Sequence, residues 1–254
     1  MTRVVKVGGR VQNDPTLAIQ LADAWDATSR CLVLVHGGGD EVTALQHAFG
    51  LTPEFVQGRR VTTARDMELV RMALSGSANK RLVGALVHEG VCAVGISGED
   101  ASLLAATPVN AETLGHVGEV QRVNALLIRH LLNGGYLPVI APVSRNIGLE
   151  LGPALNVNAD DAAAAIAVAL EASELLLISD VPGVLSGGAP VRRLTVDEAS
   201  VLMSQGTAIG GMAAKLHAAV AAVRGGVVTV RIGDLGALVD VERGTTITMT
   251  GEEA

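Results

Sequence analysis

The sequence predicts an α/β protein, a three-layer αβα sandwich with an open, mostly parallel sheet between two layers of helices. Three observations predict this fold class. Short runs of Val, Leu and Ile alternate with segments of helical length, these runs are apolar almost throughout, and two of them end in glycine pairs or triplets. Strands that are apolar throughout are typical of parallel sheets covered on both faces. No linker rich in Pro, Ser or charge divides the chain, so any two lobes are closely joined.

In the first half of the chain, the elements follow from the apolar periodicity. The first helix has Asp14 as its expected N-cap and Pro15 at its first helical position. A long amphipathic helix follows a polar, hairpin-like segment, and we expect a kink at Gly76. The order is a strand at 4–7, a helix at 16–26, a strand at 31–35, a helix at 40–49, the hairpin at 56–63, the long helix at 64–89 and a strand at 91–96.

The second half continues the alternation and ends in two late strands. An extended, partly exposed hairpin comes first, and an Ala-rich helix lies in the middle of this half. The order is the hairpin at 103–123, a helix at 123–132, a strand at 136–143, the Ala-rich helix at 160–171, a strand at 175–179, helices at 195–204 and 211–223, and strands at 227–232 and 245–249.

Composition and charge exclude several classes of protein. The net charge of −7 argues against a nucleic-acid partner, and it means that any anion site must be built from local donors. The longest apolar run, 162–170, is too short to span a membrane, and the N-terminus has no apolar signal core. We therefore expect a cytoplasmic protein. Cys31 and Cys92 lie in apolar runs, and no Cys/His cluster has metal-site spacing, so we expect no metal held by the protein alone.

Arginine is far more frequent than lysine in this chain, which has 16 Arg and only three Lys. The lysines are Lys6, Lys80 and Lys215. In such a chain a lysine can mark a place where a compact ammonium group does what a planar guanidinium cannot. Lys6 is the clearest example, because it interrupts a buried strand, where an idle ammonium group would be costly.

Glycine turns at the ends of strands indicate an anion site. Gly8 and Gly9 follow the first strand, and the triplet 37–39 follows the second. Glycine lets backbone N–H groups crowd an anion, and the N-terminus of the next helix favours negative charge. The sequence has no Gly-Lys-Ser or Gly-Lys-Thr phosphate loop, and no Gly-x-Gly-x-x-Gly follows a strand, which argues against a dinucleotide oxidoreductase.

Nine motifs in order, covering nearly the whole chain, resemble the amino acid kinase family. They are KVGGR at 6–10, VHGGG at 35–39, GRRVTT at 58–63, SANK at 77–80, GHVGEV at 115–120, NGGYLPVIAPV at 133–143, NVNAD at 156–160, SDVPGVL at 179–185 and GGMAAK at 210–215. Within the family, they are most similar to the kinases that act on N-acetyl-L-glutamate.

The resemblance implies transfer of the γ-phosphoryl group of ATP, bound as its Mg²⁺ complex, to the side-chain carboxylate of N-acetyl-L-glutamate. The product would be an acyl phosphate on the route to arginine. An N-terminal lobe, 1–172, would bind the amino-acid substrate and form a dimer, and a C-terminal lobe, 173–254, would bind ATP. Because the nucleophile is already an anion, catalysis would consist of holding two anions in line and neutralising the transferring group.

The resemblance also implies three catalytic residues. Lys6 and Lys215 would flank the phosphoryl group and stabilise its charge. Asp160 would orient both lysines through charge-assisted hydrogen bonds, and it could also cap the Ala-rich helix.

For the amino-acid substrate, the resemblance implies five binding residues. The N–H groups of Gly37 and Gly38 would receive a carboxylate, and Arg60 would clamp the α-carboxylate. Asn156 would bind the N-acetyl end, with Asn158 behind it. The doubled arginine of GRRVTT leaves open whether position 59 or 60 reaches the substrate; we expect 60 to reach it and 59 to be solvated.

For the nucleotide, the resemblance implies two glycines and two segments. Gly8 and Gly9 would face the β- and γ-phosphates. The remaining candidates are Asp180, Val181, Pro182, Gly183, Val184, Leu185, Thr207, Ala208 and Ile209, of which Asp180 is the strongest.

Two alternatives stay open at this point. One is a kinase for a carrier-linked or acylated aminoadipate in lysine biosynthesis, and the other is a non-catalytic amino-acid or nucleotide sensor on the same fold. Two departures from the family pattern are Arg10, directly after Gly9, and Ala101, where a glycine is expected after Asp100. The first strand begins at Val4, which leaves no room for the extra N-terminal helix of arginine-inhibited hexamers. We therefore expect a homodimer that arginine does not strongly inhibit.

Overall fold

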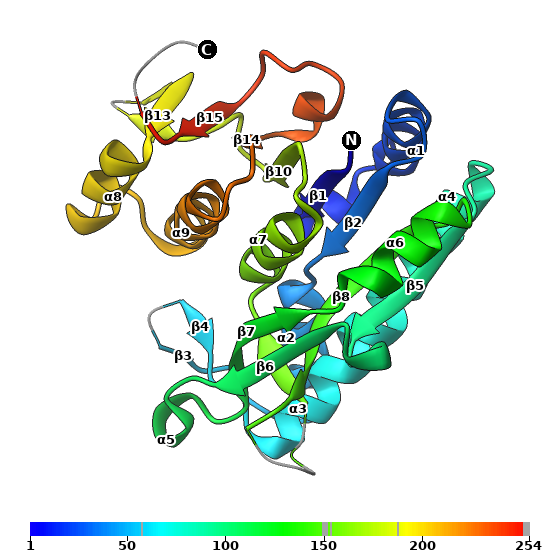
Figure 1. The fold of residues 1–254 in the computed structure, drawn as a ribbon. Coiled ribbons are helices and arrows are strands. Elements are labelled where there is room, and N and C mark those ends of the chain that lie inside the picture. The colour runs from blue at the N-terminus through cyan, green and yellow to red at the C-terminus, as the bar shows by residue number, and fades with distance from the viewer. Residues whose placement is uncertain (57, 149–151, 153, 187, 251–254) are drawn as a thin grey trace.

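The computed structural model describes residues 1–56, 58–148, 152, 154–186 and 188–250. One sheet runs through the molecule in the order β13-β15-β14-β10-β1-β2-β8-β6-β7-β9, and β5 pairs with β8 (Figure 1). Its strands are β1 (Arg3–Val7), β2 (Leu32–His36), β5 (Ala93–Gly98), β6 (Leu104–Pro108), β7 (Val117–Val123), β8 (Leu137–Asn146), β9 (Leu155–Val157), β10 (Glu174–Ile178), β13 (Arg193–Thr195), β14 (Thr229–Gly233) and β15 (Thr245–Thr248).

The pairings make the sheet mostly parallel, as predicted. Antiparallel pairs join β6 to β7, β8 to β9 and β14 to β15. The central strands β10, β1 and β2 are parallel to all their neighbours, and β8 is parallel to β2, β5 and β6. Two short hairpins lie off this sheet, β3 (Phe55–Val56) with β4 (Arg59–Arg60), and β11 (Leu185–Ser186) with β12 (Ala189–Pro190).

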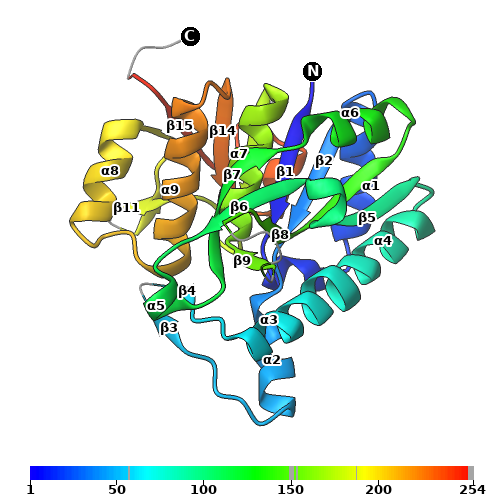
Figure 2. The ribbon, with the colours of Figure 1, turned by 60° about the horizontal axis from the view of Figure 1, so that its bottom comes forward.

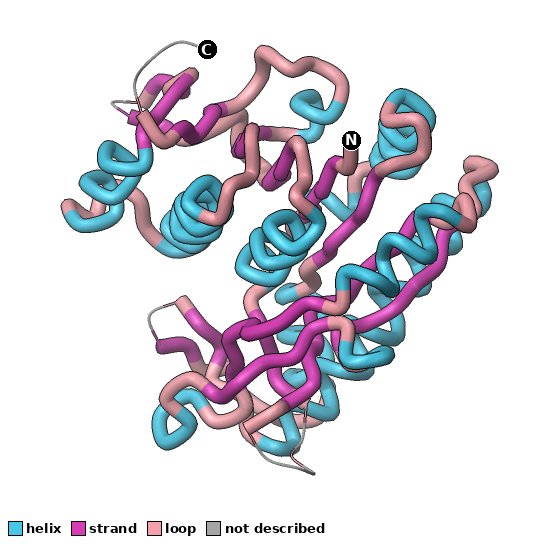
Figure 3. Tube along the Cα trace, in the orientation of Figure 1, coloured by secondary structure: helices cyan, strands magenta, loops and turns pink. Residues whose placement is uncertain are grey.

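Helices cover both faces of the sheet, which confirms the three-layer prediction (Figure 3). They are α1 (Leu17–Ala27), α2 (Gly39–Ala48), α3 (Ala64–Arg71), α4 (Asn79–His88), α5 (Ala111–Leu114), α6 (Ala125–Asn133), α7 (Ala159–Leu170), α8 (Val196–Ser204) and α9 (Gly210–Arg224). Short 3₁₀ turns occupy Arg10–Asn13, Asp100–Ser102 and Leu235–Leu238.

Side-chain alternation along the central strands builds two cores. Val4 and Leu175 face a cluster with α7 and α9, whereas Val5 and Leu176 face a cluster with α1 and α4. Since neighbouring residues of a strand point to opposite faces, Lys6 lies on the same face as Val4, toward α7. The parallel α7 and α9 lie side by side on that face in Figures 1 and 2.

The first helix begins later than Asp14, so the predicted cap was wrong. Thr16 is the N-cap residue of α1, and its own side chain makes no capping bond. The Asp14 carboxylate instead accepts hydrogen bonds from the backbone N–H and the hydroxyl of Thr16, at 2.8 and 2.6 Å. Asp14 therefore orders the turn before the helix, and the residue that directly precedes α1 is Thr16.

The kink expected at Gly76 takes the form of a π-helical segment, Met72–Ala78, between α3 and α4. A π segment inside an α-helix inserts an extra residue and is frequent at functional sites. Here it brings Leu74 against the glycine triplet, since a Cβ added at Gly38 would lie 2.7 Å from Leu74 Cδ2. The long helix is thereby fitted to the glycine turn.

Ala101 lies in the left-handed region, with φ at +48°, at the place where glycine was expected from the sequence pattern. In that conformation, a residue with a Cβ is strained by roughly 1–2 kcal/mol, and replacing it with glycine removes this strain. Glycine is more flexible in the unfolded chain, and this offsets about 0.5–1 kcal/mol of the gain. We expect Ala101→Gly to raise the free energy of unfolding by about 0.5–1 kcal/mol in urea denaturation. The control Ala165→Gly, inside α7, should lower it by about 1 kcal/mol. A loss of stability in Ala101→Gly would contradict the strain.

Candidate active site

Three parallel strands end side by side at one edge of the sheet. β1 leads into Gly8 and Gly9, β2 into the glycine triplet 37–39, and β10 into Ser179 and Asp180. Ligands of open α/β sheets bind at this carboxyl edge, where helices begin. The sequence prediction of a site at the glycine turns therefore falls at the expected edge.

Two clefts open at this edge and meet at the same residues. The hairpin-side cleft, about 250 Å³, lies between α2, α3, α7 and the β3–β4 hairpin. The α9-side cleft, about 520 Å³, lies between the first glycine turn, β10 and the start of α9. Lys6, Gly9 and Gly39 line both clefts. A ligand in one cleft would thus touch the same ammonium group as a ligand in the other.

Lys6, Asp160 and Lys215 form a buried triad between the two clefts. Lys6 Nζ lies 2.8 Å from Asp160 Oδ1, and Lys215 Nζ lies 3.3 Å from Asp160 Oδ2. All three residues are less than 10% exposed. The triad carries one net positive charge, so it leaves a cationic centre for an anion at the junction of the clefts.

The ionisation of the triad follows from burial and from its own charges. Burial would raise the pKa of Asp160, but the ammonium groups of Lys6 and Lys215 outweigh it and hold that pKa below its usual value. Burial, together with the charge of Lys6, lowers the pKa of Lys215. A carboxylate held ionised between two ammonium groups orients them and is poorly suited to accept a proton.

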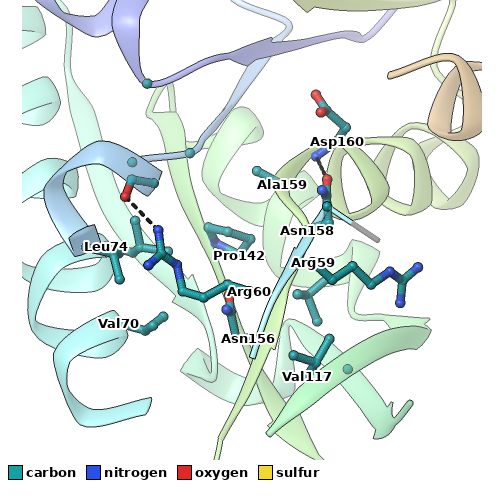
Figure 4. A pocket seen from close by; sticks show the side chains of 18 of the residues that line it. Arg59, Arg60, Val70, Leu74, Val117, Pro142, Asn156, Asn158, Ala159 and Asp160 are labelled. Atoms are coloured by element: carbon teal, nitrogen blue, oxygen red, sulfur yellow. Dashed lines mark hydrogen bonds between the residues drawn. The ribbon is translucent and has the colours of Figure 1, made fainter. Parts of the chain in front are cut away.

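Asn158, and not Asp160, caps the Ala-rich helix. The Asn158 side-chain oxygen accepts from the backbone N–H of Asp160 at 2.8 Å and of Asp161 at 3.4 Å. Asp160 is the second residue of the helix (Figure 4), and its two carboxylate oxygens pair with Lys6 and Lys215. The possible capping role of Asp160 was therefore wrong, and Asn158 fixes the backbone on which Asp160 stands.

The glycine triplet differs from the prediction in one amide. The N–H of Gly37 donates to the carbonyl of Val7 at 3.1 Å, and so joins the turn to β1 rather than facing a ligand. The carbonyl of Gly37 in turn accepts from the Gln12 side chain at 2.8 Å. Gly38 and Gly39 stand at the start of α2, where the first N–H groups have no partner within the helix. These are the amides that the turn presents to the hairpin-side cleft.

His36 is buried behind the triplet in a network that the sequence did not reveal. Its Nδ1 lies 2.8 Å from the carbonyl of Gly37, and its Nε2 lies 3.1 Å from the Asn79 side-chain nitrogen, which also donates to the Val139 carbonyl. Burial lowers the pKa of His36 to about 4. The ring is therefore neutral near pH 7 and acts as a fixed support for the turn.

The depressed pKa of His36 predicts a pH window for stability. The unfolded imidazole gains its proton near pH 6.5 and the folded one only near pH 4, so the folded state binds fewer protons between these values. Stability should therefore fall as the pH drops from 6.5 to 4, by up to about 3 kcal/mol from this residue. Urea denaturation of the protein and of His36→Gln at pH 7 and 4.5 measures it. If both proteins lose the same free energy of unfolding between pH 7 and 4.5, the fall in stability does not come from His36.

The two arginines of the hairpin point in opposite directions (Figure 4). Both line the hairpin-side cleft, but Arg60 points toward α2, where it donates to the Gly39 carbonyl at 2.9 Å and to Thr43 Oγ1 at 2.8 Å. It also donates to the Gln46 side chain, and its guanidinium lies 4.7 Å from the ring centre of Phe55. Burial lowers its pKa, yet the group keeps its charge at neutral pH. Of the two, Arg60 is placed at the glycine turn.

Asn156 lies across the hairpin-side cleft from the glycine triplet. Its side-chain nitrogen donates to Thr62 Oγ1 at 3.0 Å, and its backbone N–H donates to the His116 carbonyl. Val117, Val157, Val70, Leu74 and Pro142 supply apolar walls. The cleft thus combines cationic and amide donors at one end with an apolar and amide region at the other, which suits an acylated amino acid.

The predicted nucleotide residues divide into two groups. Gly8, Gly9, Asp180 and Val181 line the α9-side cleft. Arg10, unexplained by the sequence, lines it too and pairs with Asp180 at 3.1 Å. The others lie outside the lining of both clefts; they are Pro182, Gly183, Val184, Leu185, Thr207, Ala208 and Ile209.

Among the outlying residues, Val184 belongs to the core, and its backbone N–H donates to Thr245 Oγ1 at 2.8 Å. Gly183 sits so close to β15 that an added Cβ would lie 2.7 Å from the same hydroxyl. Ile209, by contrast, is 74% exposed immediately before α9.

Within the part of the chain that the structure describes, no group of three or more His, Cys, Asp or Glu residues could hold a metal. Asp40 and Asp180 are the carboxylates that line the α9-side cleft. Mg²⁺ is usually held by one or two carboxylates together with substrate phosphates, so this lining fits an ion that enters with a nucleotide.

Among the helices that the structure describes, none has both the length and the apolar character that a membrane span requires.

Comparisons with known proteins identify the family. Residues 1–234 match the model of the amino acid kinase family. The acetylglutamate kinase of Chloroflexus aggregans is 44% identical over 239 residues, which cover 93% of each chain. A solved structure from Streptococcus mutans superposes with a TM-score of 0.88 at 31% identity and covers 98% of this chain and 99% of its own.

A second solved structure shares the fold of this chain. N-acetylglutamate synthase from Neisseria gonorrhoeae, complexed with coenzyme A and N-acetyl-glutamate, has a TM-score of 0.81 and 27% identity. The match covers all of this chain but 60% of that one. The family motifs noted in the sequence therefore correspond to a shared three-dimensional fold.

Proposed function

The chain belongs to the amino acid kinase family, and from this premise we propose that it transfers the γ-phosphoryl group of ATP to the side-chain carboxylate of N-acetyl-L-glutamate. One observation carries the proposal: two clefts share Lys6 at the point where they meet. A carboxylate in the hairpin-side cleft and a phosphate in the α9-side cleft would approach each other at that ammonium group. The product is an acyl phosphate, the first activated intermediate on the route to arginine, and ADP leaves.

The acceptor would lie in the hairpin-side cleft. Arg60 would pair with its α-carboxylate, whose geometry matches the guanidinium fork. The amides of Gly38 and Gly39 would receive the reacting carboxylate, with Gly37 supporting the turn. Asn156 would bind the N-acetyl group beside the apolar wall, and Asn158 would hold the start of α7.

The nucleotide would lie in the α9-side cleft. Gly8 and Gly9 would face the β- and γ-phosphates, with Asp180 and Val181 beside them. The segments around Pro182 to Leu185 and Thr207 to Ile209 would hold the remainder of the nucleotide. Mg²⁺ would enter with ATP and neutralise part of the phosphate charge. In this arrangement residues 1–172 would bind the acceptor and 173–254 most of the nucleotide, while Gly8 and Gly9 of the N-terminal lobe would reach its phosphates.

The chemistry requires no general base. The attacking carboxylate is already ionised, so the protein must align it with phosphorus and stabilise the charge on the equatorial oxygens. Lys6 and Lys215 would do this from two sides, and Asp160 would keep both ammonium groups in place. No step needs a proton from Asp160, in keeping with its depressed pKa.

The assembly and location of the enzyme are also proposals. We propose a homodimer through the long helix of α3 and α4, where Met72 and Val87 are 56% and 54% exposed. We expect light scattering to give twice the mass of the chain; a monomer or hexamer would contradict it. We place the reaction in the cytoplasm, where ATP is supplied.

The experiment that tests the acceptor is ADP release with MgATP and a panel of compounds. The panel holds N-acetyl-L-glutamate, glutamate, aspartate, UMP, bicarbonate with ammonia, and N-acetyl-aminoadipate. We expect release with N-acetyl-L-glutamate alone. Release of ADP with N-acetyl-aminoadipate instead would assign the chain to the kinases of lysine biosynthesis. No release of ADP with any compound of the panel would favour a non-catalytic sensor.

A further inference from the structure

Arg59, which we expected to be solvated, lies against α7. Its guanidinium NH2 is 3.8 Å from Asp161 Oδ2, and the two side chains are only 35% and 28% exposed. In the sequence, Asp161 directly follows Asp160 and Arg59 directly precedes Arg60. The pair thus joins the immediate neighbours of two proposed site residues.

The hairpin strand β4 is held from both sides by its two arginines. Arg60 reaches α2 through the Gly39 carbonyl and Thr43, and Arg59 reaches α7 through Asp161. Each residue of this two-residue strand therefore anchors the hairpin to a different wall of the hairpin-side cleft. β4 is also paired with β3, and Thr62 after it bonds to the backbone of Leu114 and His116. Loss of the Arg59 anchor would therefore loosen β4 only on the α7 side, where Arg59 fixes it.

Other charged groups also face this pair. His217 Nδ1, on α9, lies 3.9 Å from Asp161 Oδ1 and is two residues beyond Lys215. Burial raises the pKa of Asp161, whereas Arg59 and His217 lower it, and Asp160 and Glu119 raise it. Glu119, Arg122 and these residues border a groove of about 400 Å³ outside the site. Of the two basic residues that favour the ionised form of Asp161, Arg59 has the larger effect on its pKa.

We propose that Arg59 and Asp161 are positioning residues whose ion pair fixes β4, so that Arg60 is held ready for the acceptor carboxylate. The inference rests on the proposed function for its substrate. It predicts that the pair acts on acceptor binding and leaves phosphoryl transfer in the bound complex unchanged. Neither residue touches the transferring group in this arrangement.

Steady-state kinetics of four proteins test the pair: the wild type, Arg59→Leu, Asp161→Asn and the double variant. We expect each single change to raise the KM for N-acetyl-L-glutamate about fivefold, which corresponds to roughly 1 kcal/mol for a partly exposed ion pair. The kcat and the KM for MgATP should change less than about twofold. The double variant should be no worse than either single variant, because the same interaction is lost. Arg59→Lys should restore part of the affinity.

The matched control is Arg71→Leu, which breaks an arginine–carboxylate pair of similar exposure, Arg71 with Glu99 at 2.9 Å, together with the contact of Arg71 with Glu68 at 2.7 Å. It should leave the KM for the acceptor unchanged. A fall in kcat or in stability without a rise in the KM for the acceptor would overturn the proposal. Strictly multiplicative effects of Arg59→Leu and Asp161→Asn would also overturn it, because Asp161 would then only stabilise α7.

A second readout separates this inference from the proposed function. Hydrogen exchange at the amides of residues 59 and 60 should be faster in Arg59→Leu than in the wild type, whichever acceptor the enzyme uses. If the wild type shows no turnover with N-acetyl-L-glutamate but exchange responds as expected, the function fails and the anchoring of β4 stands. Unchanged exchange would overturn the anchoring itself.

Discussion

Replacing Lys6 with Met should lower kcat by about 10²–10³-fold, the typical cost of removing one donor that stabilises transition-state charge. Lys6 is 5% exposed and lines both clefts, so its ammonium group is the one positioned to touch both anions. The aliphatic stem of Met keeps most of the volume in the strand. Kinetics with saturating MgATP and acceptor measure the loss.

The chain supplies a matched control in Lys80, which donates to the Gly95 carbonyl at 2.8 Å away from both clefts. Lys80→Met should change kcat by less than about threefold, since it removes no charge from the proposed transition state. Equal losses in the two variants would mean that Lys6 acts through stability. A fully active Lys6→Met would remove it from catalysis.

Replacing Asp160 with Asn should reduce both stability and activity. The change leaves two buried ammonium groups without their shared counter-ion, and breaking a buried pair in this way costs about 3–5 kcal/mol. Burial and Lys6 already lower the pKa of Lys215, so without the carboxylate Lys215 would lose its proton more readily. We expect kcat to fall by at least about 10²-fold for this reason.

The pH dependence of the Asp160 contribution has a definite sign. The folded pKa of Asp160 is below the ordinary value of 3.8 that it has in the unfolded chain. The stabilisation is therefore complete above pH 3.8 and is lost as the pH falls through the lower, folded pKa. The loss in Asp160→Asn is therefore fully present at pH 7, where urea denaturation should measure it. Asp26→Asn, at a surface pair with Arg30, should cost less than about 0.5 kcal/mol. Unchanged stability in Asp160→Asn would contradict the buried triad.

The sheet and its main helices could be predicted because their signals are local. The central strands are apolar along most of their length, and the main helices have apolar stripes, so the alternation of the two predicted the three layers. The β3–β4 hairpin was predicted at 56–63 from its polar composition, and the structure confirms it with strands of two residues each. The short strand β9 could not be predicted, because three residues give no periodicity. The π segment likewise depends on how Leu74 packs beside Gly38, a contact between residues far apart in the sequence.

The candidate site was predictable by its motifs but not by its internal bonds. The resemblance to the family predicted that Lys6, Asp160 and Lys215 act at one site, and in the structure their side chains form one triad. It could not reveal that the Gly37 amide is engaged by Val7, since that bond depends on the register of β1 and β2. Nor could it separate the roles of Arg59 and Arg60, which are set by the direction each side chain takes from a two-residue strand.

The central claim is that the side-chain carboxylate of N-acetyl-L-glutamate attacks the γ-phosphorus of ATP. The most direct test uses acceptor labelled with ¹⁸O in that carboxylate, MgATP, and hydroxylamine to trap the acyl phosphate. Hydroxylamine attacks the acyl carbon, so the bridging oxygen leaves with phosphate. The account predicts a hydroxamate together with inorganic phosphate that contains one ¹⁸O. Unlabelled phosphate with no hydroxamate would show that water, and not the carboxylate, receives the phosphoryl group, and would contradict the account.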